Sequence, residues 1–162
     1  IANGKLNWYA SGLCKYNGSW FYVNNGKVDF GYTGLAKNAG NWFYIKNGVL
    51  DWNYTGLCKY NGSWFYINRG ILSWNYTGLC RYGNAWYYIA NGKLNWYASG
   101  LCKYNGRWFY VNNGKVDFSY TGLARNAGNW FYIRNGVLNW NYSGSCPYNG
   151  HYYNVRNGIV VF

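Results

Sequence analysis

Acidic side chains are nearly absent from this chain. Its 162 residues include no glutamate, three aspartates and one histidine, His151. General acid–base catalysis needs positioned carboxylate or imidazole groups, and a glycosidase site needs a pair of carboxylates. A metal site needs clustered ligands such as the CxxC spacing of zinc sites, which does not occur here. We therefore predict a protein that is not an enzyme, with no catalytic residue, no metal and no cofactor.

Long apolar runs are also missing. None approaches the ~18 residues of a membrane span, so we predict no membrane-spanning segment. No signal peptide is visible, and the chain opens inside a repeat at Ile1, so we expect it to be a fragment of a longer protein. Against 15 Lys and Arg stand only three acids, and the net charge of +12 favours anionic partners. The same charge would also keep an aromatic-rich chain soluble.

Aromatic residues and a fixed period dominate what is present. The chain has 21 Tyr, 11 Trp and 8 Phe, and nearly every position recurs after about 22 residues. We call the residues at equivalent positions of successive repeats a column. The indole column contains Trp20, Trp42, Trp64, Trp86, Trp108 and Trp130. We predict a single repeat array, residues 1–162, because no unit of this kind can bury its apolar face alone. Its full units are 3–24, 25–46, 47–68, 69–90, 91–112, 113–134 and 135–156, with a stub at 157–162.

Each unit reads as a β-hairpin. Asn61-Gly62 separates two apolar-rich runs, and a type I′ turn needs positive φ at both of these positions. Side chains alternate along the following strand, so Trp64 and Tyr66 share one face and Phe65 and Ile67 share the other. No segment has helical periodicity. The sequence therefore predicts an all-β fold, a β-solenoid of stacked β-hairpins with about 22 residues per repeat.

Two columns have a structural explanation. The aspartates, Asp29, Asp51 and Asp117, share a position with Asn and Ser, which indicates side-chain hydrogen bonds within a turn. Cysteine alternates with alanine in another column, which indicates a small buried apolar side chain and free thiols. The members of the cysteine column are Cys14, Ala36, Cys58, Cys80, Cys102, Ala124 and Cys146.

The motif from Thr55 to Ile67 resembles a known family. Its pattern, TG-x-x-x-x-NG-x-W-[FY]-Y-[VI], is similar to the bacterial cell-wall-binding repeats: the choline-binding repeats, the glucan-binding repeats and the C-terminal repeats of clostridial toxins. The resemblance spans all seven units. It implies ligand sites between consecutive hairpins, built from their aromatic side chains, in a bacterial protein that is secreted or attached to the cell surface.

One position departs from the family pattern. The residue after Thr-Gly, usually Trp in choline-binding repeats and one wall of the ligand cage, is Leu57 here and Leu or Ser in the other units. A quaternary ammonium needs several ring faces around it, so the loss argues against choline unless a connecting Trp swings in. The connecting column consists of Trp8, Phe30, Trp52, Trp74, Trp96, Phe118 and Trp140.

We predict ligand contacts from the aromatic columns, with the opposite interpretation that these rings form the core of the solenoid. The connecting column and the Tyr16 column are the better candidates for exposure. The predicted ligand-binding residues are Trp8, Trp20, Tyr22, Trp42, Tyr44, Trp52, Tyr54, Trp64, Tyr66, Trp74, Tyr76, Trp86, Tyr88, Trp96, Trp108, Tyr110, Trp130, Tyr132 and Trp140.

The leading hypothesis is a non-enzymatic module that binds a cell-wall polymer or another glycan, gaining avidity from several weak sites. A second hypothesis is an adhesin-like module for a host protein such as an immunoglobulin or a mucin, since Tyr, Trp, Asn, Ser and Gly suit protein-binding surfaces. A third is a structural spacer. Basic and aromatic residues together also describe single-strand nucleic-acid binders, but the rest of the pattern does not support that partner.

Overall fold

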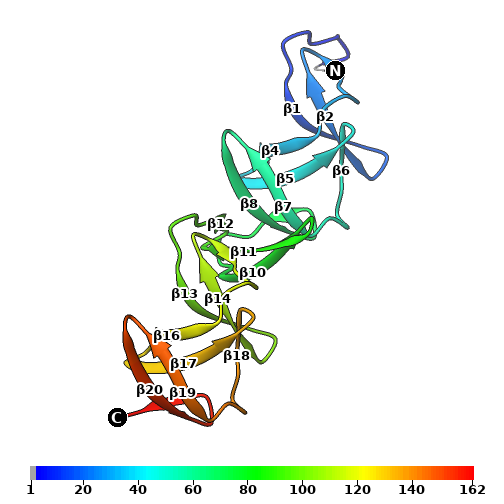
Figure 1. Ribbon diagram of the computed structural model, residues 1–162. Helices are drawn as coiled ribbons and strands as arrows, with labels where there is room; N and C mark the ends of the chain where they lie inside the picture. The colour runs from blue at the N-terminus through cyan, green and yellow to red at the C-terminus, as the bar shows by residue number, and fades with distance from the viewer. Residues whose placement is uncertain (1–2) are drawn as a thin grey trace. The chain divides into compact units, whose positions relative to one another are not determined.

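The computed structural model describes residues 3–162. Within this range the chain forms 21 short strands, all paired antiparallel, and no helix (Figure 1). These residues therefore include no helix that is long and apolar enough to cross a membrane. The predicted β-solenoid of stacked hairpins is confirmed.

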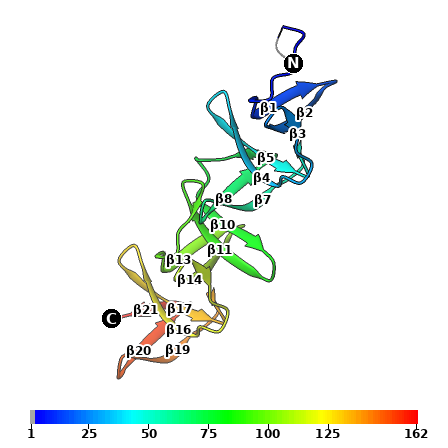
Figure 2. The same ribbon diagram turned by 90° about the horizontal axis from the view of Figure 1, so that it is seen from above.

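The chain divides into two compact units. Unit 1 contains residues 1–76 with 91–93, and unit 2 contains residues 77–90 with 94–162. Inside each unit, successive hairpins are turned relative to one another, and Figures 1 and 2 show this turning from two sides. The expectation of a single continuous array stays a prediction.

Three kinds of strand alternate along the chain. The first strands of the seven hairpins are β1 (Gly12–Tyr16), β4 (Gly34–Asn38), β7 (Gly56–Tyr60), β10 (Gly78–Tyr82), β13 (Gly100–Tyr104), β16 (Gly122–Asn126) and β19 (Gly144–Tyr148). Their partners are β2 (Ser19–Asn24), β5 (Asn41–Lys46), β8 (Ser63–Asn68), β11 (Ala85–Ala90), β14 (Arg107–Asn112), β17 (Asn129–Arg134) and β20 (His151–Arg156). Shorter strands follow each hairpin: β3 (Lys27–Val28), β6 (Val49–Leu50), β9 (Ile71–Leu72), β12 (Lys93–Leu94), β15 (Lys115–Val116), β18 (Val137–Leu138) and β21 (Ile159–Val161).

The hairpin turns form where the sequence predicts them. Asn61 has φ 46° and Gly62 has φ 77°, the left-handed conformation at both central positions that a type I′ turn requires. Ala39 adopts φ 47° in the equivalent turn of β4/β5, although alanine has no side-chain group to favour that conformation. The turn at Gly83-Asn84 also closes a hairpin, between β10 and β11.

The two faces of a hairpin carry different side chains. In β4/β5, Leu35 lies opposite Tyr44 and Lys37 opposite Trp42, so these four share one face. That face packs against the Phe65 side of the next hairpin, β7/β8. The core is thus a series of small clusters, each formed where one hairpin meets the next. The cluster between β4/β5 and β7/β8 contains Leu35, Cys58, Ile67 and Leu72 as its buried members.

The connecting segments tie each hairpin to its neighbour through the backbone. The Gly48 amide donates to the Tyr32 carbonyl (2.8 Å), and the Gly48 carbonyl accepts from the Tyr22 amide (2.8 Å). The approach is so close that a Cβ on Gly48 would lie 2.4 Å from the Asp29 carbonyl oxygen. Glycine recurs at the position of Gly48 in the repeat because two backbones meet there.

Candidate functional site

An aromatic groove lies between two consecutive hairpins of unit 1. It encloses about 190 Å³. At ~30 Å³ per molecule this volume corresponds to about six waters. We call it the Trp42 groove, and its lining residues are Leu35, Trp42, Tyr60, Asn61, Phe65, Leu72 and Trp74.

Four rings form the walls of the Trp42 groove. The Trp42 and Tyr60 rings have centroids 5.1 Å apart and planes inclined at 56°. Phe65 and Trp74 meet edge to face, with centroids 5.7 Å apart and planes at 80°. All four rings line the same small volume. Inclined ring faces around a small volume are the arrangement that attracts a cation through the ring quadrupoles.

The leucine that replaces the family's tryptophan becomes the floor of the groove. Leu35 is 2% exposed and Leu72 is also buried. Trp74, in the connecting segment, is 53% exposed and supplies a wall at the rim. A quaternary ammonium site needs a connecting Trp at this place, and binding in the groove stays a prediction.

The ring arrangement of the Trp42 groove recurs at two equivalent places within unit 2, which we name the Trp86 groove and the Trp130 groove by this equivalence. In the Trp86 groove, Trp86 and Tyr104 have centroids 5.2 Å apart at 58°, and Phe109 faces Phe118 edge to face at 6.4 Å. In the Trp130 groove, Trp130 and Tyr148 lie 5.1 Å apart at 59°. The inclination of the two rings is thus reproduced to within a few degrees in all three grooves.

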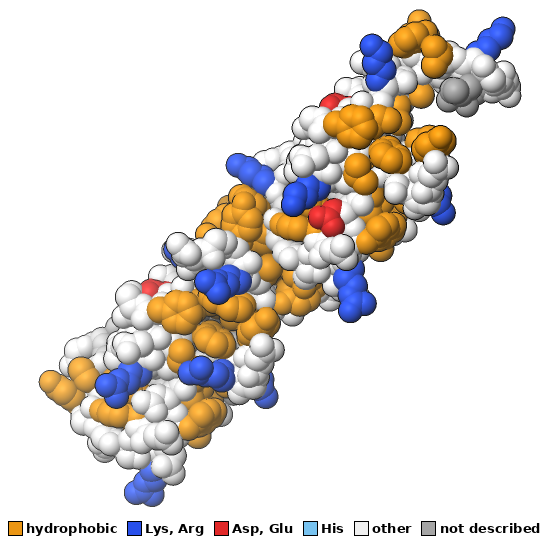
Figure 3. Space-filling view, turned by 90° about the vertical axis from the view of Figure 1, so that its right-hand side faces the viewer, with side chains coloured by type: hydrophobic (Ala, Val, Ile, Leu, Met, Phe, Trp, Pro, Cys, Tyr) orange, Lys and Arg blue, Asp and Glu red, His pale blue; other side chains and the backbone are white. Residues whose placement is uncertain are grey.

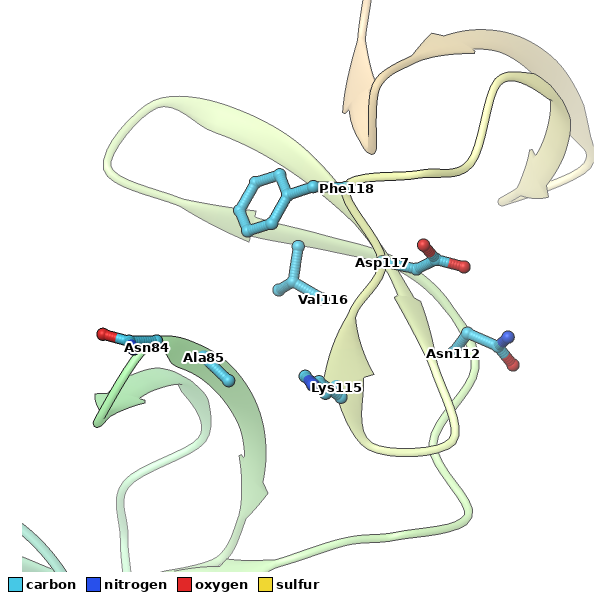
Figure 4. Close-up of a pocket in the computed structure, with 7 residues that line it drawn as sticks. All are labelled: Asn84, Ala85, Asn112, Lys115, Val116, Asp117 and Phe118. Carbon is cyan, nitrogen blue, oxygen red and sulfur yellow. The ribbon is translucent and has the colours of Figure 1, made fainter.

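A wider hollow adjoins the Trp86 groove (Figure 4). It encloses about 430 Å³ and is lined by Asn84, Ala85, Asn112, Lys115, Val116, Asp117 and Phe118. Val116 and Phe118 lie on one side of the ribbon, and the Asp117 carboxylate lies on the other. Asp117 nevertheless belongs to the lining, so this hollow, unlike the Trp42 groove, has an acidic residue at its edge.

Two equivalent places lack the tyrosine wall. In the β1/β2 and β4/β5 pair, Asn38 takes the position of Tyr60, beside Trp20, Phe43 and Trp52. In unit 2, Asn126 takes the same position beside Trp108. An amide has no ring face, so these grooves offer one wall fewer. The grooves of the chain are thus of two kinds, with tyrosine or with asparagine.

The predicted tryptophans are only partly buried. Those of the indole column, including Trp64, are half-buried walls, and those of the connecting column are exposed. The exposed members are Trp8, Trp52, Trp74, Trp96 and Trp140. The opposite interpretation, in which every indole is sealed in the core, does not describe them.

The predicted tyrosines of the second strands pack in the contacts between hairpins. Tyr44 stacks on Tyr54 with centroids 3.9 Å apart, and the Tyr54 hydroxyl donates to the Leu57 carbonyl (2.6 Å). These rings lie in the clusters between hairpins rather than in the lining of the Trp42 groove. The same stacked arrangement is found for Tyr22 with Tyr32, Tyr66 with Tyr76, Tyr110 with Tyr120, and Tyr132 with Tyr142.

Sequence reasoning left two wall residues out of its list of ligand contacts. The sequence favours exposure for the column of Tyr16 and Tyr60, which is absent from the predicted contacts, and it places Phe65 on the opposite face from Trp64; Tyr60 is half-buried. Both assignments concern one hairpin at a time, whereas the groove joins the Trp face of one hairpin to the Phe face of the next. The signal that could have found them is the 22-residue period from Trp42 to Trp64. If consecutive hairpins stack at this period, Phe65, which follows Trp64 in the chain, becomes the neighbour of Trp42.

Basic side chains flank the grooves. Lys37 lies directly opposite Trp42, and Arg81 and Arg125 lie opposite Trp86 and Trp130 in the same way. Opposite residues in an antiparallel pair lie on the same face of the sheet. Figure 3 shows one face of the molecule, where Lys and Arg are interspersed among the apolar patches and acidic side chains are few.

The aspartates of the repeat accept hydrogen bonds within turns. The Asp117 carboxylate accepts hydrogen bonds from the Ser119 hydroxyl (2.5 Å) and amide (2.9 Å), and these bonds lower the pKa of Asp117. Asp51 accepts from the Asn53 amide in the equivalent turn (2.9 Å). A carboxylate held ionised by its own turn is poorly suited to donate a proton. Among residues 3–162 no three potential metal ligands cluster.

The thiols are free, and most of them are covered. Cys58, Cys80 and Cys146 are buried, whereas Cys14 is exposed. Burial raises the pKa of the Cys58 and Cys80 thiols to about 11, so both are protonated at neutral pH. A protonated thiol is a weak nucleophile, and these positions fill space beneath the tyrosine walls.

Comparison with known proteins identifies the repeat. The choline-binding repeat profile matches six segments: 10–29, 31–51, 53–73, 75–95, 98–117 and 119–139. No curated protein sequence matches the chain.

The solved structures that match this chain include CbpJ from Streptococcus pneumoniae, 22% identical over 94% of this chain and 52% of that one, with a TM-score of 0.37. CbpF in complex with ipratropium is 23% identical over 94% and 60% of the two chains, with a TM-score of 0.36. An alternansucrase in complex with isomaltotriose is 20% identical over 78% and 10%, with a TM-score of 0.38. This chain therefore spans 10% to 60% of those solved chains.

Proposed function

The chain belongs to the choline-binding repeat family, and we propose that its tyrosine-walled grooves bind quaternary ammonium groups of a bacterial cell-wall polymer. The single observation that carries the proposal is the Trp42 groove, where four rings surround a small volume above a leucine floor. On this proposal the module has no catalytic activity and works at the bacterial surface or as part of a secreted protein.

The groove chemistry matches a trimethylammonium group. Cation–π attraction contributes about 0.5–2 kcal/mol, more where the cation is desolvated, and Leu35 and Leu72 offer the methyl groups apolar contact. No carboxylate lines the Trp42 groove. An ammonium such as that of lysine would lose its hydration there without a hydrogen-bond acceptor of full charge. A quaternary ammonium has no N–H to satisfy and suffers less from this loss.

The charge around the grooves determines the kind of polymer. A net charge of +12 repels free cations and attracts polyanions. Lys37, Arg81 and Arg125 stand beside the three tyrosine-walled grooves. The combination suits a polymer with an anionic backbone and quaternary ammonium substituents, such as a choline-bearing teichoic acid. Several weak sites on one chain would then act together on one polymer.

The experiment is a calorimetric titration of the chain with choline and with its uncharged carbon isostere, in which a tert-butyl group replaces the trimethylammonium. We expect saturable heat with choline and affinity lower by about 2- to 30-fold for the isostere, corresponding to 0.5–2 kcal/mol. Trp42→Leu combined with Trp74→Leu removes two walls of one groove and should abolish that site.

Trp8→Leu is the matched control, because Trp8 is an exposed indole that lines neither the Trp42 nor the Trp86 groove. It should leave the number of sites unchanged. Equal affinity for choline and its isostere would contradict the cation-binding grooves. Absence of choline binding, with capture of a mucin or an immunoglobulin, would favour the adhesin-like function, and absence of every ligand would favour a spacer.

A further inference from the structure

A stacked tyrosine pair recurs from hairpin to hairpin. The second-strand tyrosine of one hairpin lies face to face with a tyrosine of the following connecting segment, at 3.8 to 3.9 Å between centroids. In the pair formed by Tyr110 and Tyr120, the Tyr120 hydroxyl also donates to the Leu123 carbonyl (2.6 Å). The pair therefore fills the space between hairpins and satisfies a backbone carbonyl.

Tyr88 is the one member of this column whose partner position holds alanine, Ala98. The backbone is unchanged: the Gly114 amide donates to the Ala98 carbonyl at 2.8 Å, just as the Gly136 amide donates to the Tyr120 carbonyl at 2.8 Å. The difference is in the side chain: the tyrosine ring of the other pairs is absent at Ala98, and a pocket of about 280 Å³ lies in its place. The pocket is lined by Tyr88, Asn95, Ala98, Ser99, Gly100, Leu101, Cys102 and Val111.

Three observations agree that a ring is missing there. A Cβ on Gly122 would lie 3.1 Å from the Tyr120 hydroxyl, whereas a Cβ on Gly100 would meet nothing within 4 Å. Leu123 is buried, whereas the equivalent Leu101 is only half-buried. Among residues 3–162, no side chain donates to the Leu101 carbonyl in the way that Tyr120 donates to Leu123.

We propose that this pocket binds a phenol ring, which stacks on Tyr88 and donates its hydroxyl to the Leu101 carbonyl. The occupant is defined by the five stacked pairs, in four of which the attached phenol also donates its hydroxyl to the carbonyl three residues on. An apolar cavity of ~150 Å³ accepts benzene, so 280 Å³ is ample for a substituted phenol. The ligand class includes free phenols and the tyrosyl side chain of another polypeptide.

The nearest competitor for the pocket is the chain's own Tyr97. It precedes Ala98, and its ring is 94% exposed. Its backbone amide donates to the Asn95 side-chain oxygen (3.0 Å), as in the other turns of this column. The Tyr97 ring thus lies outside the pocket, in a turn whose geometry the repeat shares.

The test is a two-dimensional NMR titration of the full chain with para-cresol, which is the tyrosine side chain without its backbone. We expect saturable shifts confined to residues around Tyr88 and Leu101. Toluene, which lacks the hydroxyl, should bind about fivefold more weakly, because it loses one hydrogen bond worth about 1 kcal/mol. N-acetyl-tyrosinamide distinguishes a tyrosyl ligand from a small phenol: shifts at lower concentration than for para-cresol assign the pocket to a polypeptide.

Two variants make the test decisive. Ala98→Tyr restores the residue found in the stacked pairs, so it should fold, gain stability and lose para-cresol binding. Tyr97→Ala should bind para-cresol as the parent chain does. If the Tyr97→Ala variant binds para-cresol and the parent chain does not, Tyr97 fills the pocket in solution, and this result would overturn the proposal. Unchanged binding by Ala98→Tyr, or shifts in the Trp42 groove instead, would overturn it as well. Choline binding is measured separately and is expected to be unaffected.

Discussion

At the scale of single residues, each position of the repeat has one structural role that recurs from unit to unit. The glycines with positive φ show this best, because they differ in what surrounds them. Gly48 approaches the Asp29 carbonyl oxygen and the Phe30 Cα, whereas Gly40 has open space where a Cβ would be. Conformation and close packing can therefore be separated by substitution.

Gly48→Ala should destabilise the protein by more than about 2 kcal/mol, since strain at positive φ combines with a collision against backbone. Gly40→Ala has a similar φ, +84° against +75°, and should cost about 1 kcal/mol. Denaturant unfolding measures both. Equal losses would mean that the close approach of the two segments does not exist in solution.

The partly buried tyrosines Tyr32 and Tyr120 predict a loss of stability in alkali. Burial raises the pKa of Tyr32 and of Tyr120 from 10.0 to about 12. The folded chain therefore keeps these phenol protons where the unfolded chain releases them. Their contribution to stability is complete below pH 10 and disappears as the pH rises toward 12.

The measurement is the free energy of unfolding at a series of pH values above 8. Tyr32→Phe combined with Tyr120→Phe keeps the stacked rings and removes the titrating groups. The double variant should start less stable, because two hydrogen bonds are lost. Between pH 10 and 12 it should decline less steeply than the parent chain. A parallel decline of the two proteins would contradict the raised pKa values.

At the scale of the element, the hairpin turns were predictable because their chemistry is local. Asn-Gly specifies a type I′ turn wherever it lies between two apolar runs, and the turn at Asn61-Gly62 forms as predicted. The pairing of one hairpin's Trp face with the next hairpin's Phe face was not predictable, because it depends on how two units stack. Tyr60 and Phe65 were therefore missing from the predicted site.

The turn at Ala39 offers a gain in stability. Ala39 has φ 47°, a conformation that asparagine tolerates better than alanine. Ala39→Asn should stabilise the protein by about 0.5–1 kcal/mol. The reverse change in the equivalent turn, Asn61→Ala, should destabilise it by a similar amount. Thermal unfolding compares the two, and a shift in the same direction for both would contradict this account of the turn.

The asparagine-walled groove predicts a gain of function. Asn38 occupies the position of Tyr60, beside Trp20, Phe43 and Trp52. Asn38→Tyr should complete the fourth wall and add one choline site to the chain. Asn38→Leu adds bulk without a ring quadrupole and serves as the control. Calorimetry counts the sites, and an unchanged number with Asn38→Tyr would show that the tyrosine wall does not decide occupancy.

At the scale of the whole molecule, periodicity made the fold class predictable before any coordinates. The exposure of the connecting tryptophans also followed the sequence, since Trp52 and Trp74 are both exposed. The second-strand tyrosines could not be separated from binding residues by pattern alone. Their stacking partners and the hydroxyl bond from Tyr54 to Leu57 become visible only once the connecting segment is placed.

The most direct test is a crystal structure of the chain grown with choline. Density for the trimethylammonium group should lie between Trp42, Tyr60, Phe65 and Trp74, and in the two equivalent grooves of unit 2. The asparagine-walled positions beside Trp20 and Trp108 should hold none at the same concentration. Choline found elsewhere on the surface, with the Trp42, Trp86 and Trp130 grooves occupied only by water, would contradict the account.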